Sequence, residues 1–324
     1  MTALLEIRNM NVTYRNKEKS VYAARDVSLT LEEGDSLGIV GESGSGKSTL
    51  AMGLLRLLPE KTAAVTGEAI FKGETDLLSI TQKEYADLRW KDISVVFQKA
   101  MNSLSPVHRI RTQIEDIYHV HEPKASKEEI RDRAYELFRM VGLPERVYNL
   151  YPHEMSGGVL QRVAIAISLL HEPSLLIFDE ATTALDVVTQ GQILDEVVRL
   201  EKDMHMTRIM ITHDMSVVSA SCSKVAVMYA GCLLEFGPVG KVLKEPVHPY
   251  TQKLMESFPS LHGEIKELKS IPGSLPDLSI LHEGCVFAER CTKATERCRK
   301  ERPVMREYAD GHTAACFAAE GEVR

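Results

Sequence analysis

The sequence predicts an α/β protein with a parallel core sheet. Three observations support this: short apolar strands alternate with helical segments, the segment GESGSGKS at residues 41–48 follows one such strand, and the acidic pair Asp179-Glu180 ends another. Strands that alternate with helices favour a parallel sheet covered by helices. In such a sheet, the carboxyl ends of the strands gather the ligand-binding residues at one edge. We therefore expect the loop and the acidic pair to serve the same ligand.

The first element of this site is the glycine loop, which fits the pattern G-x-x-x-x-G-K-[ST]. A short strand over 37–40 precedes it and an apolar helix over 48–58 follows it, which disfavours the alternative of a tight turn without a ligand. Glycines let backbone N–H groups turn toward an anion, and the helix N-terminus adds positive potential. The expected nucleotide-binding residues are Gly41, Ser43, Gly44, Gly46, Lys47, Ser48 and Thr49, with Lys47 on the phosphates and Ser48 on Mg²⁺.

Composition limits the class of protein. The chain has 324 residues and a formal net charge of −7, which argues against a broad nucleic-acid-binding surface. The longest apolar run, around 163–170, is shorter than the roughly 18 residues of a membrane span. Glu6 and Arg8 interrupt the first apolar stretch, which argues against a signal peptide. We therefore expect a cytosolic protein, in which cysteines are poor disulfide candidates.

The remaining elements follow from periodicity. Alternating residues over 3–40 predict antiparallel strands, and a helical pattern runs from about 102 to 151. Within it, Ser126 and Glu129 form a predicted capping box. A further apolar helix is expected over 161–170. Buried strands are expected over 93–97, 175–178, 209–212 and 224–229. Prolines become frequent after residue 238, so we place a domain boundary near Val247.

Two more segments have the chemistry of a nucleotide site. Asp179, at the end of a predicted strand, is expected to hold Mg²⁺, and Glu180 to orient or deprotonate an attacking water. Ser156-Gly157-Gly158 opens a predicted helix, which is a second place for an anion to bind. Because the chain already has one phosphate loop, this second site suggests that the nucleotide of a partner docks there.

Together these motifs resemble the ATP-binding cassette family over residues 3–240. Gln98 resembles the Q-loop glutamine, Ser156-Gly157-Gly158 the signature motif, and Asp179-Glu180 the Walker B aspartate with the catalytic glutamate. Ala184-Leu185-Asp186 resembles the D-loop, and His213 the switch histidine. The resemblance implies an ABC-type nucleotide-binding domain over 1–246, with a parallel core sheet, an antiparallel β subdomain and a helical subdomain at about 102–165.

The same resemblance implies the ligands and their contacts. It implies ATP bound between the phosphate loop of one subunit and the signature motif of the other, in a head-to-tail dimer. Gln98 would join Ser48 and Asp179 around Mg²⁺, His213 would contact the γ-phosphate, and Asp186 would lie at the nucleotide interface. The adenine-stacking aromatic is matched less well: Tyr14 is close in sequence, but Asn16 occupies the expected position. Tyr14 is either this platform or a strand core aromatic.

The sequence departs from the family pattern at several motif positions. Met155 replaces a leucine, Val159-Leu160 replaces a polar and basic pair, Lys99-Ala100 replaces an acid and a proline, and Ala181 replaces a proline. None of these changes removes a catalytic group.

Residues 247–324 are similar to the C-terminal extension of oligopeptide/dipeptide importer ATPases. The similarity rests on HPYT at 248–251, IPGSLP at 271–276 and the cysteines that follow. It implies a second ATPase subunit, expected to be a homologue, two transmembrane permease subunits and an extracellular solute-binding protein. The chain would then be peripheral on the cytoplasmic face of the cell membrane and drive uptake of di- or oligopeptides. Related importers carry nickel or sugars.

Four cysteines crowd into this small Cys-rich extension: Cys285, Cys291, Cys298 and Cys316. Four thiols in a cytosolic tail favour a metal or cluster over disulfides. Zinc sites usually have closer ligand pairs, whereas four thiolates also suit a [4Fe–4S] cluster. Some importer subunits that resemble this chain carry such a cluster, so we expect one here, with zinc or free thiols as the alternatives.

Two other functional classes fit the phosphate loop. A soluble cassette ATPase of repair or translation usually has two cassettes or a long coiled insertion, and this sequence has neither. A P-loop kinase or GTPase would not explain the segment 156–158 or His213. The sequence therefore favours the ATPase subunit of an importer.

Overall fold

The computed structural model describes residues 3–16, 19–97, 104–181, 186–257 and 271–318, which form two compact units. The first unit comprises Met1–Glu32, Ser36–Ser79 and Ile211–Arg324, and the second comprises Glu33–Asp35 and Ile80–Met210. Helix α1 and nine of the described strands belong to the first unit, and each unit is described separately below.

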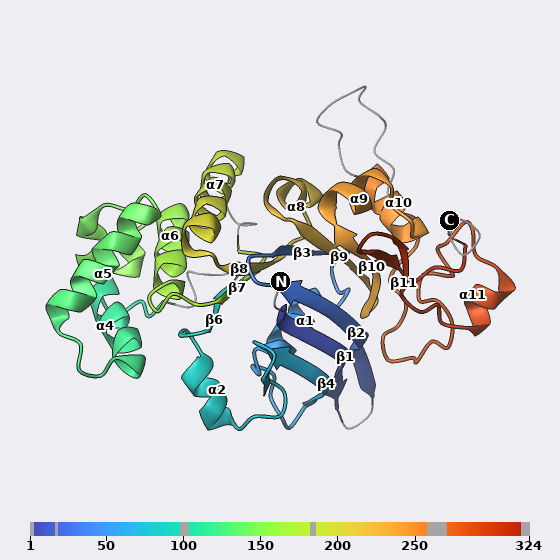
Figure 1. Ribbon diagram of the computed structural model, residues 1–324, viewed down its shortest axis with the longest axis horizontal. Helices are drawn as coiled ribbons and strands as arrows, with labels where there is room; N and C mark the ends of the chain where they lie inside the picture. Colours follow the sequence, from blue (N-terminus) through green and yellow to red (C-terminus); the bar gives the residue numbers. More distant parts are fainter. Residues whose placement is uncertain (1–2, 17–18, 98–103, 182–185, 258–270, 319–324) are drawn as a thin grey trace. The chain divides into compact units, whose positions relative to one another are not determined.

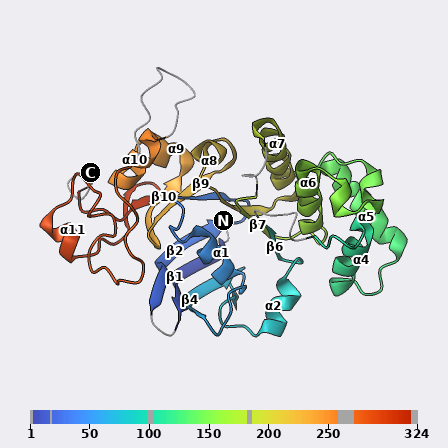
Figure 2. The same cartoon turned by 180° about the vertical axis from the view of Figure 1, so that it is seen from behind.

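The first unit begins with an antiparallel sheet of order β2-β1-β4-β5 (Figure 1). Its strands are β1 (Ala3–Arg15), β2 (Ser20–Glu32), β4 (Ala63–Phe71) and β5 (Thr75–Asp76). Strands β1 and β2 pair antiparallel from Ala3↔Glu32 to Arg15↔Ser20, which confirms the expected antiparallel strands over this stretch. Helix α1 (Lys47–Leu54) packs on this sheet, because a Cβ added to Gly53 would lie 2.8 Å from Met10 Cε and 3.0 Å from Val12 Cγ2 (Figure 2).

The prediction of antiparallel strands over residues 3–40 was wrong for the last strand of this range. Strand β3 (Ser36–Val40) pairs in parallel with β9 (Lys224–Tyr229), not antiparallel with a neighbour in sequence. All five residues of β3 are buried, as is typical of a strand covered on both faces. The chain leaves β3 through the loop and α1, a crossover that suits a parallel strand.

In the first unit the order continues as β3-β9-β10-β12-β11. Strand β10 (Cys232–Pro238) is antiparallel to β9, so this sheet is mixed. The other elements of this part are α8 (Met215–Ser221), α9 (Val239–Lys244), α10 (Pro249–Glu256), α11 (Glu296–Lys300), β11 (Arg306–Ala309) and β12 (His312–Ala314).

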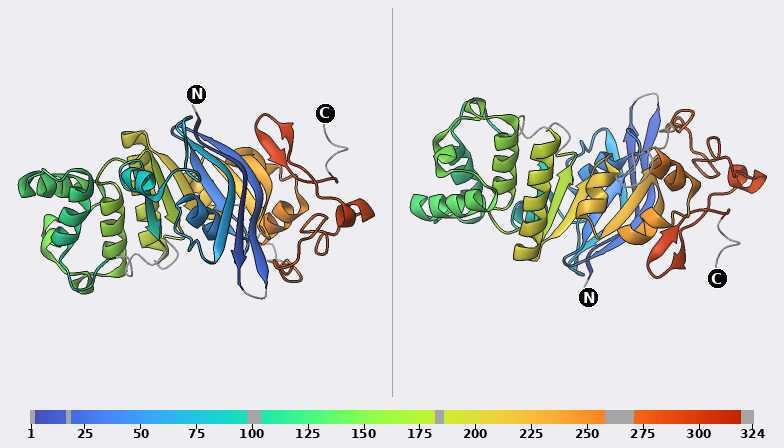
Figure 3. Two further views of the ribbon diagram at one scale, coloured as in Figure 1. Left: turned by 90° about the horizontal axis from the view of Figure 1, so that it is seen from below. Right: turned by 90° about the horizontal axis from the view of Figure 1, so that it is seen from above.

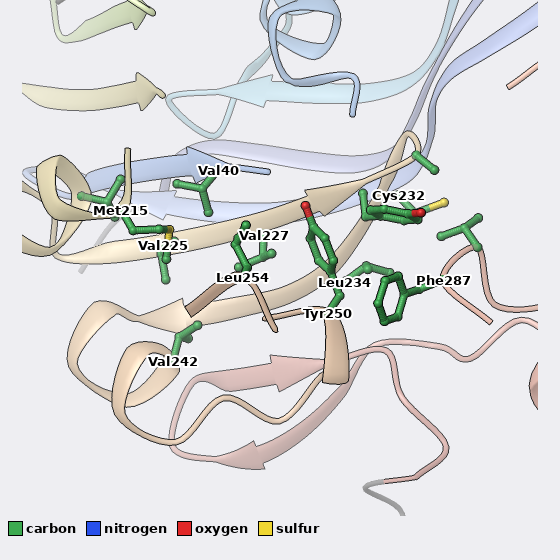
Figure 4. Close-up of a cluster of buried hydrophobic side chains, with 14 of the residues drawn as sticks. Val40, Met215, Val225, Val227, Cys232, Leu234, Val242, Tyr250, Leu254 and Phe287 are labelled. Atoms are coloured by element: carbon green, nitrogen blue, oxygen red, sulfur yellow. The ribbon is translucent and has the colours of Figure 1, made fainter. Parts of the chain in front are cut away.

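A buried cluster joins these elements of the first unit (Figure 4). It contains apolar residues of β9 and β10 together with Tyr250 of α10 and Phe287, whose ring centroids lie 5.3 Å apart. Tyr250 and Phe287 are fully buried, so residues beyond Val247 are part of the core around β10 rather than a loosely attached tail.

The second unit contains parallel strands and a group of helices. Strands β6 (Ile93–Phe97) and β7 (Leu175–Asp179) pair in parallel from Ile93↔Leu175 to Phe97↔Asp179, and β8 (Thr207–Ile211) follows in the order β8-β7-β6. Helices α4, α5 and α6 lie side by side (Figure 3). The helical elements are α2 (Gln82–Leu88), α4 (Ile110–His121), α5 (Lys127–Met140), η1 (Glu145–Asn149), η2 (Pro152–Glu154), α6 (Gly157–Ser168) and α7 (Val187–Met204).

Local signals in this unit behave as the sequence predicts. Ser126 accepts a hydrogen bond from the Glu129 backbone N–H, and Glu129 accepts one from the Ser126 N–H, which confirms the capping box of α5. Among the described residues, no helix is long and apolar enough to cross a membrane.

Candidate active site

The phosphate loop connects β3 to α1, as predicted, and its shape requires glycine at two positions. Gly41 has φ of 146° and Gly46 has φ of 96°, in the region that L side chains rarely adopt. A Cβ on Gly41 would lie 2.0 Å from the Met228 carbonyl oxygen, and one on Gly46 would lie 2.1 Å from that of Ala23. The loop therefore packs tightly against β9 and β2, and any side chain at position 41 or 46 would displace it.

Lys47 is the first residue of α1, and its side chain folds back across the loop. The ammonium group donates to the carbonyl oxygens of Gly41 at 2.9 Å and Glu42 at 3.0 Å. Lys47 is only 5% exposed, so this charge is held in place rather than extended into water. A fixed positive charge beside a helix N-terminus is suited to binding phosphate. Ser48 and Thr49 follow in the first turn of the same helix.

His213 lies at the same edge of the first unit as this loop. The Thr212 backbone N–H donates to the carbonyl oxygen of Ile39 at 3.1 Å, two residues before Gly41. His213 follows directly and is exposed. The next residue, Asp214, caps α8 by accepting from the Ser216 N–H at 2.8 Å. His213 thus lies between a strand end and a helix start, next to the strand that leads into the phosphate loop.

Tyr14 lies in β1, opposite Val21 of β2 and Ala63 of β4, and is half-buried. Asn16 forms the turn after this strand, where its Oδ1 accepts from the Lys19 N–H at 2.7 Å.

In the second unit, the acidic pair closes β7. Asp179 is 7% exposed and opposite Phe97 of β6. Glu180 has φ of 48°, a left-handed conformation that costs about 1–3 kcal/mol for a residue other than glycine. Strained backbone of this kind clusters at functional sites, where it aims a side chain. Gln98, Lys99-Ala100 and Ala184-Leu185 lie outside the described residues.

Ser156 begins helix α6, and Gly157 and Gly158 form its first turn, as the sequence predicts. Ser156 and Gly157 are exposed, and within the described part of the chain the Ser156 side chain makes no capping hydrogen bond. The start of this helix is therefore exposed to solvent. Leu160, which departs from the family pattern, is 2% exposed. An apolar residue is tolerated at this position because its side chain is buried.

Asp186 is the N-cap of α7. Its carboxylate accepts from the Thr189 backbone N–H at 3.0 Å and from the Thr189 hydroxyl at 2.7 Å. These hydrogen bonds lower the pKa of Asp186, so the residue stays ionised at the helix N-terminus.

The four extension cysteines line one small pocket, together with His248, Phe317 and neighbouring residues. All six cysteines lie among the described residues, and none of them forms a disulfide there. Burial, together with the nearby thiols of Cys298, Cys316 and Cys291, raises the pKa of Cys285 to about 12. Among the described residues, no group of three or more His, Cys, Asp or Glu side chains is arranged to hold a metal ion.

The structure also reveals contacts at the phosphate loop that the sequence analysis missed. Arg290 forms an ion pair with Glu42 at 2.9 Å, and the Tyr250 hydroxyl accepts from the Glu42 N–H at 3.0 Å. These residues lie more than 200 positions beyond the loop in sequence, and no local pattern links them to it.

Comparison with known proteins shows the same two parts. Residues 24–183 match the ABC transporter family, and residues 234–298 match the oligopeptide/dipeptide transporter C-terminal region. A probable peptide ABC transporter ATP-binding protein of Sinorhizobium fredii is 44% identical over 97% of this chain and 94% of its own length. The oligopeptide transport ATP-binding protein AppD of Bacillus subtilis is 39% identical over 99% of this chain and 98% of its own.

Solved structures show a similar fold. A dimeric ATP-binding cassette in a post-hydrolysis state, bound to ADP and Pi, aligns with a TM-score of 0.65 and 30% identity. The alignment covers 72% of this chain and 98% of that one.

Proposed function

Because the chain belongs to the ATP-binding cassette transporter family, and within it to the ATPase subunits with an oligopeptide/dipeptide transporter C-terminal region, we propose that it hydrolyses ATP to drive peptide import. The observation that carries this proposal is the phosphate loop, with a buried Lys47 and two obligatory glycines, next to the strand end that bears His213. Nickel and sugar import, and a role in repair or translation, are not favoured by relatives named for peptide transport.

In the proposed reaction, Gly41, Ser43, Gly44, Gly46, Lys47 and Thr49 bind the phosphates, and Tyr14 supports the adenine. Glu180, whose backbone is left-handed, accepts the proton of the attacking water. His213 donates to the γ-phosphate. Ser48, Asp179 and Gln98 are oxygen donors, the ligand type that Mg²⁺ prefers, and the ion would neutralise phosphate charge.

The working unit in this proposal is a pair of cassettes. Ser156, Gly157 and Gly158 present a helix start to solvent, which suits the nucleotide of a partner subunit, and Asp186 lies at the same interface. The partner is expected to be a homologous ATPase subunit, so the pair is a heterodimer. Two transmembrane permease subunits and an extracellular solute-binding protein complete the importer, and this chain lies peripherally on the cytoplasmic face of the membrane.

We also propose that 1–246 is the nucleotide-binding domain, with its helical subdomain at about 102–165, and that 247–324 is an extension that holds a [4Fe–4S] cluster. The thiol ligands in this proposal are Cys285, Cys291, Cys298 and Cys316, which line the same pocket. The four sulfur atoms of a zinc site must all lie about 2.3 Å from a single ion. The four thiolates of a [4Fe–4S] cluster each bind a different iron atom and can therefore lie further apart. The raised pKa of Cys285 keeps this thiol protonated until a cation binds.

Uptake by the reconstituted importer tests the proposed function. The complete complex is reconstituted in proteoliposomes with the cassettes facing the lumen. ATP is enclosed in the lumen, and the solute-binding protein is added outside. These proteoliposomes should accumulate labelled di- and oligopeptides. A complex with Glu180→Gln should bind peptide at the solute-binding protein but not accumulate it. Accumulation of nickel or sugars in place of peptides would overturn the assigned substrate and leave the ATPase assignment intact.

A further inference from the structure

Arg290 of the C-terminal extension contacts the phosphate loop of its own chain. Its Nη1 atom lies 2.9 Å from Glu42 Oε2 and 3.1 Å from the Tyr229 hydroxyl. The same guanidinium donates to two backbone carbonyls of the extension, Pro272 at 2.8 Å and Ile271 at 3.0 Å. The Arg290 side chain is only 7% exposed. It is therefore fixed by the extension and presents one of its donors to the loop.

Two further contacts from the C-terminal part reach the same loop. The Tyr250 hydroxyl accepts from the Glu42 backbone N–H at 3.0 Å, and Tyr250 is fully buried. Leu275 Cδ1 lies 3.4 Å from the position that a Cβ on Gly44 would take, so its side chain rests on the loop. The loop conformation at Glu42 and Gly44 thus depends on residues beyond the sheet that carries it.

The charge of Glu42 gives the ion pair a specific consequence. Glu42 is the acidic residue of the segment that receives the phosphates, and its carbonyl oxygen also binds the Lys47 ammonium. A carboxylate close to bound phosphate repels it. Glu42 Oε1 is buried and makes no hydrogen bond within the described part of the chain, so the carboxylate relies on Arg290 for compensation. Burial lowers the pKa of Arg290, but the hydrogen bonds to Glu42 and to the Tyr229 hydroxyl outweigh it and raise the pKa overall, so Arg290 remains charged.

We propose that Arg290 is a positioning residue for ATP: it neutralises Glu42 and holds the phosphate loop in its binding conformation. The C-terminal extension thereby sets the ATP affinity of its own chain's phosphate loop.

The test is a double-mutant cycle on the full-length chain, with ATP affinity measured by a fluorescent ATP analogue. Arg290→Met should raise the Kd about three- to tenfold, the effect of one uncompensated charge several Å from the phosphates. In a Glu42→Gln background, the same Arg290→Met change should leave the Kd nearly unaltered, because no carboxylate remains to be neutralised. Arg299→Met, which removes an exposed arginine of the same extension, is the matched control and should bind as the wild type does.

Arg290→Lys distinguishes charge from local packing. The lysine retains the positive charge but loses the hydrogen bonds that the guanidinium donates to the Ile271 and Pro272 carbonyls. Its Kd for ATP should be within about twofold of the wild-type Kd. An Arg290→Met chain that binds ATP normally would overturn the proposal. So would a defect of equal size in the Glu42→Gln background, since that result would mean that Arg290 supports only the fold of the extension or its cysteine pocket.

Discussion

Glu235 of β10 and His312 of β12 form a hydrogen bond of 2.7 Å between two buried side chains that are 77 residues apart in sequence. The same carboxylate accepts from the Val247 N–H at 2.8 Å and the His248 N–H at 2.9 Å. The Glu235 side chain therefore binds the C-terminal segment near its beginning, at Val247 and His248, and near its end, at His312. The burial of Tyr250 and Phe287 nearby gives this attachment an apolar core as well.

We therefore expect Glu235→Ala to lower the free energy of unfolding by about 3 kcal/mol, because it leaves buried backbone donors and His312 without their acceptor. Chemical denaturation of the full chain measures this change, and limited proteolysis should cut the C-terminal segment faster. Glu289→Ala, which changes an exposed glutamate of the same segment, should cost less than 0.5 kcal/mol or so. A loss below about 1 kcal/mol for Glu235→Ala would mean that water replaces the missing carboxylate.

Glu180→Gln should preserve ATP binding and lower the rate of hydrolysis about a hundredfold or more, because the amide keeps the shape of the side chain but cannot accept a proton. Steady-state phosphate release by the assembled complex gives the rate, and ATP binding is measured separately. Glu172→Gln is a matched control, since Glu172 also has a left-handed backbone, with φ of 56°, but lies outside the predicted motifs. Wild-type hydrolysis by the Glu180→Gln complex would exclude Glu180 as the base.

The parts of this molecule that the sequence predicts are those with local rules. The phosphate loop follows from glycine spacing and helix capping, and the Ser126 capping box follows from two residues three positions apart. The parallel pairing of β3 with β9 depends on a strand almost 200 residues away, and alternation alone suggested an antiparallel partner. The contact of Arg290 with Glu42 is less predictable still, because isolated charges have no periodicity that reveals their partner.

Ser156→Arg should stop ATP turnover in the assembled pair while ATP binding to the chain's own phosphate loop persists. The added side chain occupies the exposed start of α6, where the nucleotide of a partner is proposed to dock. Thr292→Arg, at an exposed position of the extension, adds the same side chain elsewhere and should hydrolyse ATP normally. Full hydrolysis by a strictly monomeric preparation at low concentration would contradict the need for a second cassette.

The last prediction concerns the cysteine pocket. Protein purified without oxygen should be brown and contain about four iron and four sulfide ions per chain if the four cysteines hold a [4Fe–4S] cluster. Cys291→Ser should abolish the colour and make the extension more susceptible to proteolysis, because the loops around the pocket would lose the cluster that links them. The Cys291→Ser chain should lose its iron but largely retain ATP binding. Cys222→Ser, a half-buried cysteine outside the pocket, is the matched control and should keep its iron.

Metal analysis separates the alternatives for this pocket. One equivalent of zinc with no iron would replace the cluster by a zinc site with the same four ligands. Absence of both metals after anaerobic purification would leave four free thiols. In that case the attachment of the extension would rest on Glu235, His312 and the buried rings of Tyr250 and Phe287. The Cys291→Ser chain would then resist proteolysis as well as the wild type does, because no bound metal would have been lost.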